Sequence, residues 1–234
     1  MPTALVTGAG GFLGRSLVPR LEGAGWKIQL VGREGPFPKQ GDAVIHLAQG
    51  EGPDMRPVAV DLTRRLAAWA QASGTRVFLL ASSGSALEPS DDYGKAKREA
   101  EGVVLGVGLP RAVVLRFHTL FGPGQAPERL IPRLREAVRT GTPIEVAEPD
   151  GVRLSPTHVE EAAEAVLRCL LNPSVSGTFD VAGPEALTVG EIARRLGPAV
   201  LKPRARRPGE KDLVGDPDAL ERILGWKPST GCRP

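Results

Sequence analysis

Tyr93 and Lys97 stand four positions apart within residues 93–107, which we expect to form a helix. This spacing places both side chains on one face of the helix. A phenol ionises at about pH 10 in water, and a neighbouring ammonium group lowers that pKa by stabilising the phenolate. We therefore expect Lys97 to lower the pKa of Tyr93, the only tyrosine of the chain, and to make it a general acid or base toward a carbonyl or hydroxyl group.

A pair of serines follows residues 76–81, which we expect to form a β-strand. Open parallel sheets bind their ligands at the C-terminal ends of the strands, so the hydroxyl of Ser83 could orient the same oxygen. A tyrosine and a lysine at this spacing are common by chance, and an aromatic ring packed beside a solvated lysine would show it too. The unique tyrosine and the serine-ended strand just before it favour Ser83, Tyr93 and Lys97 as catalytic residues.

A glycine motif lies at residues 8–14, between an expected strand at 3–7 and an expected helix at 12–22. Its first glycine would allow a tight turn, its second a close approach of pyrophosphate, and its third close packing of the helix on the sheet. The helix N-terminus offers free N–H groups to phosphates. A mere tight turn is the alternative. The motif predicts a dinucleotide site formed by Gly8, Gly11, Phe12, Leu13 and Gly14.

The residue after the second strand indicates which nicotinamide cofactor is bound. An acid at that place binds the ribose 2′-hydroxyl, but here Arg33 follows the expected strand at residues 27–31. A guanidinium group pairs bidentately with a phosphate, so Arg33 favours the 2′-phosphate of NADP. We expect NADP as the cofactor, with NAD as the second choice. A solvated loop arginine is the alternative interpretation.

Apolar strands alternate with helical segments along most of the chain. The further expected strands are residues 43–47, 111–117 and 178–182, and the further expected helices are residues 58–72, 127–139, 158–171 and 189–196. This order is typical of α/β proteins, in which helices cover both faces of a parallel sheet. Residues 198–209 are rich in proline and arginine, and we expect them to run over the surface.

Together these motifs resemble the extended short-chain dehydrogenase/reductase family, which includes nucleotide-sugar epimerases, dehydratases and reductases. The resemblance runs along the whole chain, and segments such as residues 45–48, 116–124 and 206–210 follow in the order of the family. It implies a Rossmann-like, doubly wound parallel sheet. It also implies NAD(P)-dependent oxidoreduction or epimerisation of a nucleotide-sugar-like substrate.

The resemblance assigns further contacts. It implies cofactor contacts for Leu47, Ala48, Tyr93 and Lys97, and substrate contacts for Thr119, Arg207 and Glu210. Arg207 would clamp a diphosphate, although the basic run around it could also be a solvated charge run or a nucleic-acid patch. Thr119 stands where many members carry asparagine, and Glu210 replaces an aspartate. These departures affect the identity of the substrate more than the chemistry.

A deletion separates this chain from the longer members. Only eight residues, 34–41, lie between Arg33 and Asp42, whereas a crossover through a helix needs about 10–12. We therefore expect the sheet to lack its usual third strand and to end at residues 27–31. We also expect one domain over residues 1–234, with a core of about 1–117 and 155–182 and a C-terminal substrate lobe of about 118–154 and 183–234.

Composition restricts the remaining function classes. Thirty basic and 27 acidic residues leave a net charge of +3, and the basic run lacks interleaved aromatics, so nucleic-acid binding is the weakest interpretation. No apolar run approaches the roughly 20 residues that span a bilayer. Two cysteines and no basic leader favour a reducing, cytoplasmic setting. The three histidines lack the spacing of a metal site.

The expected partner is therefore a small molecule, a nucleotide sugar by resemblance, with no nucleic acid, membrane or metal. The family also implies a homodimer through the helices near residues 58–72 and 93–107. A second hypothesis is an NADP-binding redox sensor or partner protein without turnover. The deletion and the changed substrate residues motivate that alternative.

Overall fold

The computed structural model describes residues 1–50 and 52–232. At its centre is a six-stranded sheet in the order β10-β5-β4-β3-β1-β2, in which all neighbouring strands are parallel. The strands are β1 (Thr3–Thr7), β2 (Lys27–Leu30), β3 (Ala43–His46), β4 (Val77–Ser83), β5 (Arg111–Phe117) and β10 (Gly177–Val181). The structure thus confirms the predicted α/β fold with a Rossmann-like parallel sheet.

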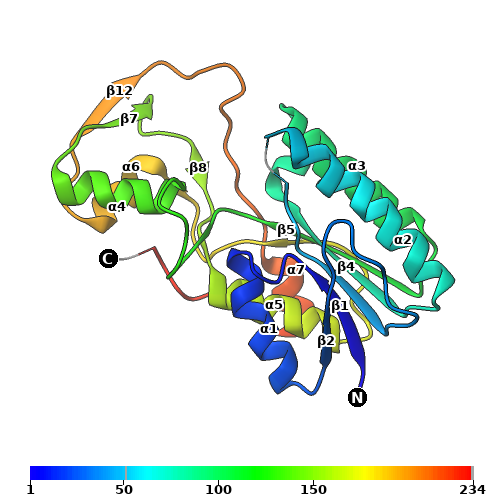
Figure 1. The fold of residues 1–234 in the computed structure, drawn as a ribbon. Helices are drawn as coiled ribbons and strands as arrows, with labels where there is room; N and C mark the ends of the chain where they lie inside the picture. Colours follow the sequence, from blue (N-terminus) through cyan, green and yellow to red (C-terminus); the bar gives the residue numbers. More distant parts are fainter. Residues whose placement is uncertain (51, 233–234) are drawn as a thin grey trace.

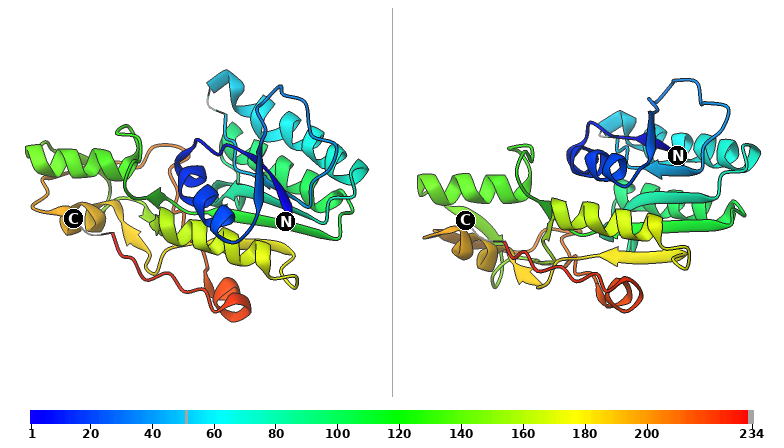
Figure 2. Two further views of the ribbon diagram at one scale, coloured as in Figure 1. Left: turned by 60° about the horizontal axis from the view of Figure 1, so that its bottom comes forward. Right: turned by 90° about the horizontal axis from the view of Figure 1, so that it is seen from below.

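Helices cover both faces of this sheet (Figures 1 and 2). On one face α1 (Phe12–Gly23) packs beside α5 (Val159–Leu171), with α7 (Asp218–Leu224) next to α5. On the other face lie α2 (Leu62–Ala72) and α3 (Asp92–Gly106). Each face encloses its own cluster of buried apolar side chains. Because the strands are parallel, the glycine loop after β1 and the serines of β4 lie at the same edge of the sheet.

The predicted deletion is confirmed, because β2 is the edge of the sheet and residues 34–41 contain no strand. Instead this segment turns back over α2. The ring of Phe37 lies 6.1 Å from that of Trp69, and Trp69 Nε1 donates a hydrogen bond of 2.8 Å to the carbonyl of Pro38. The short connection is thus held against α2 by the contact between Phe37 and Trp69 rather than by a further strand.

Elements outside the sheet form a C-terminal lobe with its own apolar cluster, visible at the upper left of Figure 1. The elements of the lobe are α4 (Leu130–Thr140), β7 (Ile144–Ala147), β8 (Arg153–Leu154), β11 (Leu187–Thr188), α6 (Val189–Leu196) and β12 (Leu201–Arg204). Two short strands, β6 (Leu120–Phe121) and β9 (Thr157–His158), pair where the chain passes between sheet and lobe. The residue bounds that we expect for a substrate lobe stay a prediction.

Three features of the fold were not predicted. Part of the segment expected to run over the surface forms β12, which pairs in parallel with β7. Pro203 is tolerated there because a two-stranded sheet leaves one side of each strand without a partner. Helix α7 was not predicted. The expected helix at residues 58–72 instead begins with a wider π-helical turn, Pro57–Asp61, before α2.

Among the described residues, no helix is both long and apolar enough to cross a membrane.

Candidate active site

The glycine loop fits the close packing that a phosphate-binding turn requires. Gly8 has a positive φ of 70°, and a Cβ there would lie 2.6 Å from the backbone nitrogen of Ala48. A Cβ at Gly14 would overlap the carbonyl oxygens of Gly8 and Ala9. Gly8 and Gly14 therefore allow the loop to pack closely against the end of β3 and against the helix.

The N-terminus of α1 is open to an anion. Gly11 is the N-cap residue and provides no side-chain cap, and the first turn contains no acidic residue. Its free N–H groups and its positive dipole end suit a pyrophosphate. The residues present thus fit the diphosphate of a dinucleotide, which would bind along Gly11, Phe12 and Leu13.

A buried histidine, His46, positions the segment after β3, which lies beside the glycine loop. His46 Nδ1 lies 2.6 Å from Thr7 Oγ1, which also accepts a hydrogen bond of 3.2 Å from the Ala48 N–H. The opposite side of the ring bonds to the backbone of Val58 in the π-helical turn. Burial, followed by the charge of Lys97, lowers the pKa of His46 to about 3, so the ring is neutral. Leu47 and Ala48 are therefore held beside Gly8, where the resemblance places the cofactor.

The three candidate catalytic residues come together at the ends of β4 and α3. Asp91 caps α3 by accepting a 2.7 Å hydrogen bond from the Gly94 N–H. Lys97 Nζ lies 5.8 Å from the centre of the Tyr93 ring, and a side-chain hydrogen bond joins Tyr93 to Ser83. Ser83 Oγ also accepts a 3.2 Å hydrogen bond from the Ser85 N–H. The helix spacing and the serine-ended strand thus bring these side chains into one site.

The lysine of this site is buried. Lys97 is 4% exposed, and its Nζ donates a 3.1 Å hydrogen bond to the carbonyl of Ala81. Burial lowers the pKa of Lys97 to about 8, while the attraction of Glu101 opposes this change. Lys97 is therefore still largely protonated at neutral pH, which its expected role requires.

The expected effect of Lys97 on the phenol is wrong. Burial raises the pKa of Tyr93 above its ordinary value, whereas the hydrogen bond of Ser83 and the charge of Arg129 only partly oppose the rise. The spacing correctly placed Lys97 on the same helix face, but it gave no information on how deeply the phenol is buried. In this site, desolvation outweighs the nearby cations.

Arg33, the predicted NADP determinant, lies in a cluster of charged side chains after β2. Its Nη1 is 2.9 Å from Asp54 Oδ2, and Arg65 donates a 2.8 Å hydrogen bond to the Arg33 carbonyl. The Arg65 guanidinium also lies 5.2 Å from the centre of the Phe37 ring. Arg33 is thus positioned by neighbours that residue spacing alone did not indicate.

Thr119, the first predicted substrate residue, follows β5 and has a positive φ of 35°. This conformation is strained for a β-branched residue, whereas asparagine, the residue that the family resemblance places here, tolerates it. Such strain often accompanies functional positions. The observation is compatible with a substrate role for Thr119, which stays a prediction.

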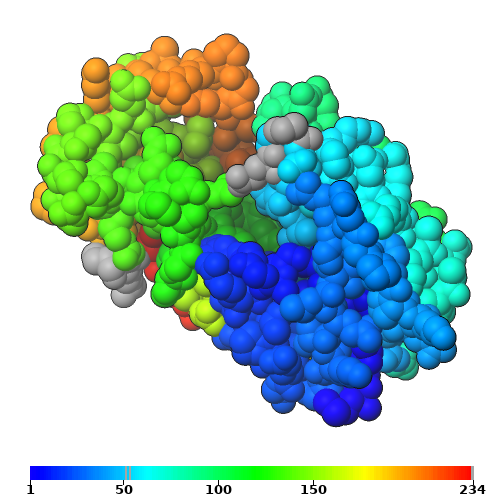
Figure 3. All heavy atoms as spheres, in the orientation of Figure 1, coloured from blue at the N-terminus to red at the C-terminus, as the bar shows by residue number. Residues whose placement is uncertain are grey.

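The other two predicted substrate residues line a cavity of about 1010 Å³ in the lobe. Its apolar wall comes from α4, β7 and β8 and includes Leu130, Leu134, Ile144, Val146 and Leu154. Arg204, Arg207 and Glu210 lie along the same cavity. All residues that line this cavity belong to the lobe, so it is distinct from the hollow in Figure 3 between the lobe, in green and orange, and the blue glycine-loop region. The charge of Arg129, the residue before α4, reaches Tyr93 and thus connects this helix with the catalytic residues.

Arg207 and Glu210 differ in how strongly neighbouring residues bind their side chains. Arg207 is exposed, with its Nη2 3.5 Å from Glu145 Oε2. Glu210 pairs with Arg204 and accepts a 2.8 Å hydrogen bond from the Arg207 N–H. Arg204, the largest cause, and then the Arg207 backbone lower the pKa of Glu210 to about 2. Glu210 thus stabilises the loop that carries Arg207. Direct contact of Glu210 with substrate stays a prediction.

Sequence reasoning missed two groups of residues at this site. Arg15 on α1 donates hydrogen bonds to the carbonyls of Gly10 (3.3 Å) and Gly124 (2.8 Å), joining the glycine loop to the segment after β5. Glu101 and Arg116 form a buried ion pair next to β4. Glu101 follows Lys97 by four residues, so its position on the same helix face was readable. Within the described residues, no cluster of three or more His, Cys, Asp or Glu side chains could hold a metal ion.

The sequence matches known proteins over most of its length. Residues 36–182 match the model of the NAD dependent epimerase/dehydratase family. Ceramide reductase of Caulobacter vibrioides is 30% identical over 72% of this chain, and the match covers 61% of that protein. The probable polysaccharide biosynthesis protein EpsC of Bacillus subtilis is 30% identical over 57% of this chain and 22% of that protein. The chain thus spans less than two thirds of the curated relatives it matches.

A solved structure agrees with these matches. MoeE5, solved with UDP-glucuronic acid and NAD, is 26% identical, with a TM-score of 0.81 over 98% of this chain and 94% of that one. UDP-glucose 4-epimerase of Thermus thermophilus shares the fold with a TM-score of 0.78 at 22% identity, over 98% of this chain and 94% of that one. The chain therefore belongs to the NAD-dependent epimerase/dehydratase family, within the extended short-chain dehydrogenases/reductases.

Proposed function

We propose that this chain is an NADP-preferring oxidoreductase or epimerase that acts on a nucleotide-sugar-like substrate. The observation that carries the proposal is the convergence of Ser83, Tyr93 and the buried Lys97 at the sheet end that also holds the glycine loop. Conversion of a nucleotide sugar by the purified protein with added cofactor tests it.

Each of the three residues has a distinct role in the proposed reaction. A bound nicotinamide cofactor would supply or accept the hydride. Tyr93 donates or takes the proton at the substrate oxygen, and Ser83 orients that oxygen through a hydrogen bond. Lys97 holds the ribose of the cofactor and places a positive charge beside the Tyr93 ring.

The substrate class rests on the lobe. Its cavity is within the usual size of small-molecule sites and carries the exposed Arg207 together with Arg204. The exposed Arg207 beside an apolar wall suits a diphosphate that bears a larger group, while Glu210 holds Arg204 next to it. MoeE5, which resembles this chain over nearly its whole length, was solved with UDP-glucuronic acid and with UDP-glucose. Because ceramide reductase is one of the relatives, lipid carbonyls are a second class of compound to test.

Cofactor choice gives a first prediction. Arg33→Ala should weaken NADP binding about tenfold, or about 1.4 kcal/mol, and spare NAD, because only NADP offers a 2′-phosphate to the guanidinium. This is less than a buried charged pair would lose, since the Arg33 side chain is 45% exposed. Calorimetric titration of both cofactors measures the effect.

Arg76→Ala is the matched control, because Arg76 is an exposed arginine paired with Asp42 at the opposite end of the sheet. It should leave both affinities unchanged. Equal losses for NADP and NAD in Arg33→Ala would reject Arg33 as the cofactor determinant.

The diphosphate clamp gives a second prediction. Arg207→Ala should raise KM for a nucleotide sugar about tenfold and change kcat little, because it removes binding that is equal in ground and transition states. Arg206→Ala serves as the control, since Arg206 is the neighbouring arginine and its Nη2 lies 3.4 Å from Oδ1 of Asp212. Steady-state kinetics of the two variants compare them. Unchanged nucleoside-diphosphate binding in Arg207→Ala would leave this residue as part of a solvated charge run.

A cofactor-binding sensor without turnover is the second candidate. The raised pKa of Tyr93 favours it, because a phenol that resists ionisation is a poor general base. A cytoplasmic location and a homodimer through α2 and α3 stay predictions of composition and family resemblance. Analytical ultracentrifugation measures the oligomeric state.

A further inference from the structure

A buried carboxylate lies one helical turn beyond the candidate catalytic lysine. Glu101 is 2% exposed. Its Oε1 accepts a 2.5 Å hydrogen bond from Ser82 Oγ and a 2.9 Å bond from Arg116 Nε, and its Oε2 accepts a 2.7 Å bond from Arg116 Nη2. Glu101 thus connects α3 with β4 at the residue before Ser83 and with β5.

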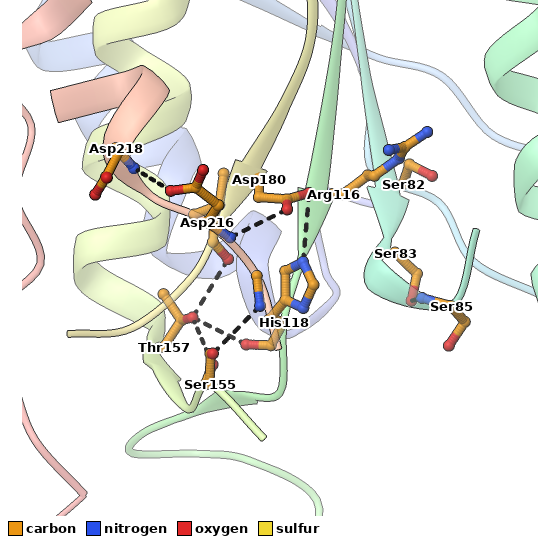
Figure 4. A network of polar contacts seen from close by, with 12 residues as sticks. Ser82, Ser83, Ser85, Arg116, His118, Ser155, Thr157, Asp180, Asp216 and Asp218 are labelled. Carbon is orange, nitrogen blue, oxygen red and sulfur yellow. Dashed lines mark hydrogen bonds and ion pairs between the residues drawn. The ribbon is translucent and has the colours of Figure 1, made fainter. Parts of the chain in front are cut away.

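A network of polar side chains lies near Arg116 at the ends of β5 and β10 (Figure 4). Arg116 extends over β4 beside Ser82, and its charge acts on Asp180 of β10. Asp180 Oδ1 lies 3.4 Å from His118 Nε2, and Asp180 Oδ2 accepts a 3.2 Å hydrogen bond from the Asp216 N–H. Burial opposes the charge of Asp180, but His118, the Asp216 backbone and Arg116 hold its pKa below the usual range. Glu101 is therefore the main partner of the Arg116 charge, and Asp180 adds a smaller attraction.

We propose that Glu101 is a positioning residue that, through Ser82 and Arg116, holds the strand of Ser83 against the helix of Tyr93 and Lys97 and places its carboxylate one turn from the Lys97 ammonium. The proposal rests on the catalytic role of Lys97 in the proposed function. It adds a residue that touches neither substrate nor cofactor.

Among the groups around Lys97, Glu101 is the one whose negative charge favours the ammonium form. On β3 it faces His46, which is neutral, and on β4 it donates to the carbonyl of Ala81. On its own helix it faces the Tyr93 ring and Glu101, which raises the pKa of Lys97 against the effect of burial. Arg116 of β5 is bound to Glu101 on the side of the carboxylate that faces β5. Without Glu101 the ammonium would be buried with no opposite charge.

The geometry also explains why a carboxylate stands there. Its two oxygens together bind one hydroxyl on β4 and both arms of a guanidinium on β5, so three neighbouring elements meet at one side chain. Charged hydrogen bonds of this kind are shorter and stronger than neutral ones. Since Ser82 precedes Ser83, loss of Glu101 frees the end of β4 on which Ser83 depends.

Two variants of opposite charge test the proposal. Glu101→Gln removes the anion and should lower the Lys97 pKa by about one pH unit. Arg116→Met removes the cation that competes for Glu101 and should raise that pKa. A purely structural role predicts that both variants disturb the site in the same direction. Glu99→Gln is the matched control, because Glu99 lies on the same helix but pairs with the exposed Arg56 and Arg64.

Nuclear magnetic resonance of ¹³C-labelled lysine side chains reads the pKa directly in residues 1–234 without added substrate. The chain has seven lysines, and Lys97→Met identifies the resonance of interest. Opposite shifts in Glu101→Gln and Arg116→Met, with Glu99→Gln unchanged, support the proposal. An unmoved Lys97 pKa, or equal shifts in both variants, overturns it.

If Glu101→Gln does not fold, judged by circular dichroism, Arg116→Met decides alone: a raised Lys97 pKa supports the proposal, and an unchanged or lowered one overturns it. Because this titration needs no turnover, its failure is distinct from that of the proposed function. A charge link between Glu101 and Lys97 together with an active Tyr93→Phe variant would reject the catalytic role but keep the electrostatic one.

Discussion

Replacement of Tyr93 by phenylalanine should lower kcat by about 10²–10⁴-fold, the range that general acid–base groups contribute. The variant removes one hydroxyl and keeps the ring that packs beside Lys97, so cofactor affinity and thermal stability should stay near those of the wild type. Steady-state kinetics and calorimetry on the same preparation separate the two effects. Wild-type kcat in Tyr93→Phe would show that the proton moves through another group.

Lysine variants provide the matched comparison for that experiment. Lys97→Met should also reduce kcat strongly, because it removes the buried ammonium next to the phenol. Lys95→Met should not, since Lys95 is exposed and only pairs with Asp92 on the same helix. A similar loss in both lysine variants would point to helix stability rather than to the charge beside Tyr93.

Substitution of Gly14 by alanine should have the largest effect on folding and cofactor binding together. The added Cβ would overlap the carbonyl oxygens of Gly8 and Ala9, which are backbone atoms and cannot move away as a side chain does. Overpacking of this kind costs about 1–3 kcal/mol. It also pushes the glycine loop away from the helix that would receive the phosphates. Thermal unfolding and dinucleotide titration measure the two losses.

Gly23→Ala is the control for this variant. Gly23 ends the same helix, and a Cβ there meets no atom within 4 Å. Its stability should equal or exceed that of the wild type, because alanine favours helix more than glycine by about 1 kcal/mol. Unchanged stability and dinucleotide affinity in Gly14→Ala would mean that the loop is looser than its packing indicates.

The order of the sheet and the position of the site were predictable because their signals are local. Apolar runs marked the six strands of the sheet, and glycine spacing marked the turn after β1. The short connection at residues 34–41 correctly predicted an edge at β2, since chain length limits what can fit there. The spacing of Tyr93 and Lys97 correctly predicted a shared helix face.

Properties that depend on distant neighbours were not predictable in the same way. The pKa of Tyr93 is raised because the fold buries the phenol, and no residue pattern states how deep a side chain lies. Pro203 concealed β12, since proline is rare inside strands and only the edge position permits it. No residue pattern indicated that Glu210 pairs with Arg204 and accepts a hydrogen bond from the Arg207 backbone, and its contact with substrate stays a prediction.

One measurement tests the central claim that this site performs chemistry. Purified protein is incubated with NADP or NAD and a panel of nucleotide sugars and lipid carbonyls, while nicotinamide absorbance and products by mass spectrometry are followed. We expect the wild type to convert at least one nucleotide sugar and Tyr93→Phe to bind cofactor equally well without converting it. Tight cofactor binding by both proteins, with no conversion of any compound by the wild type, would contradict the proposed function and identify the chain as a cofactor sensor.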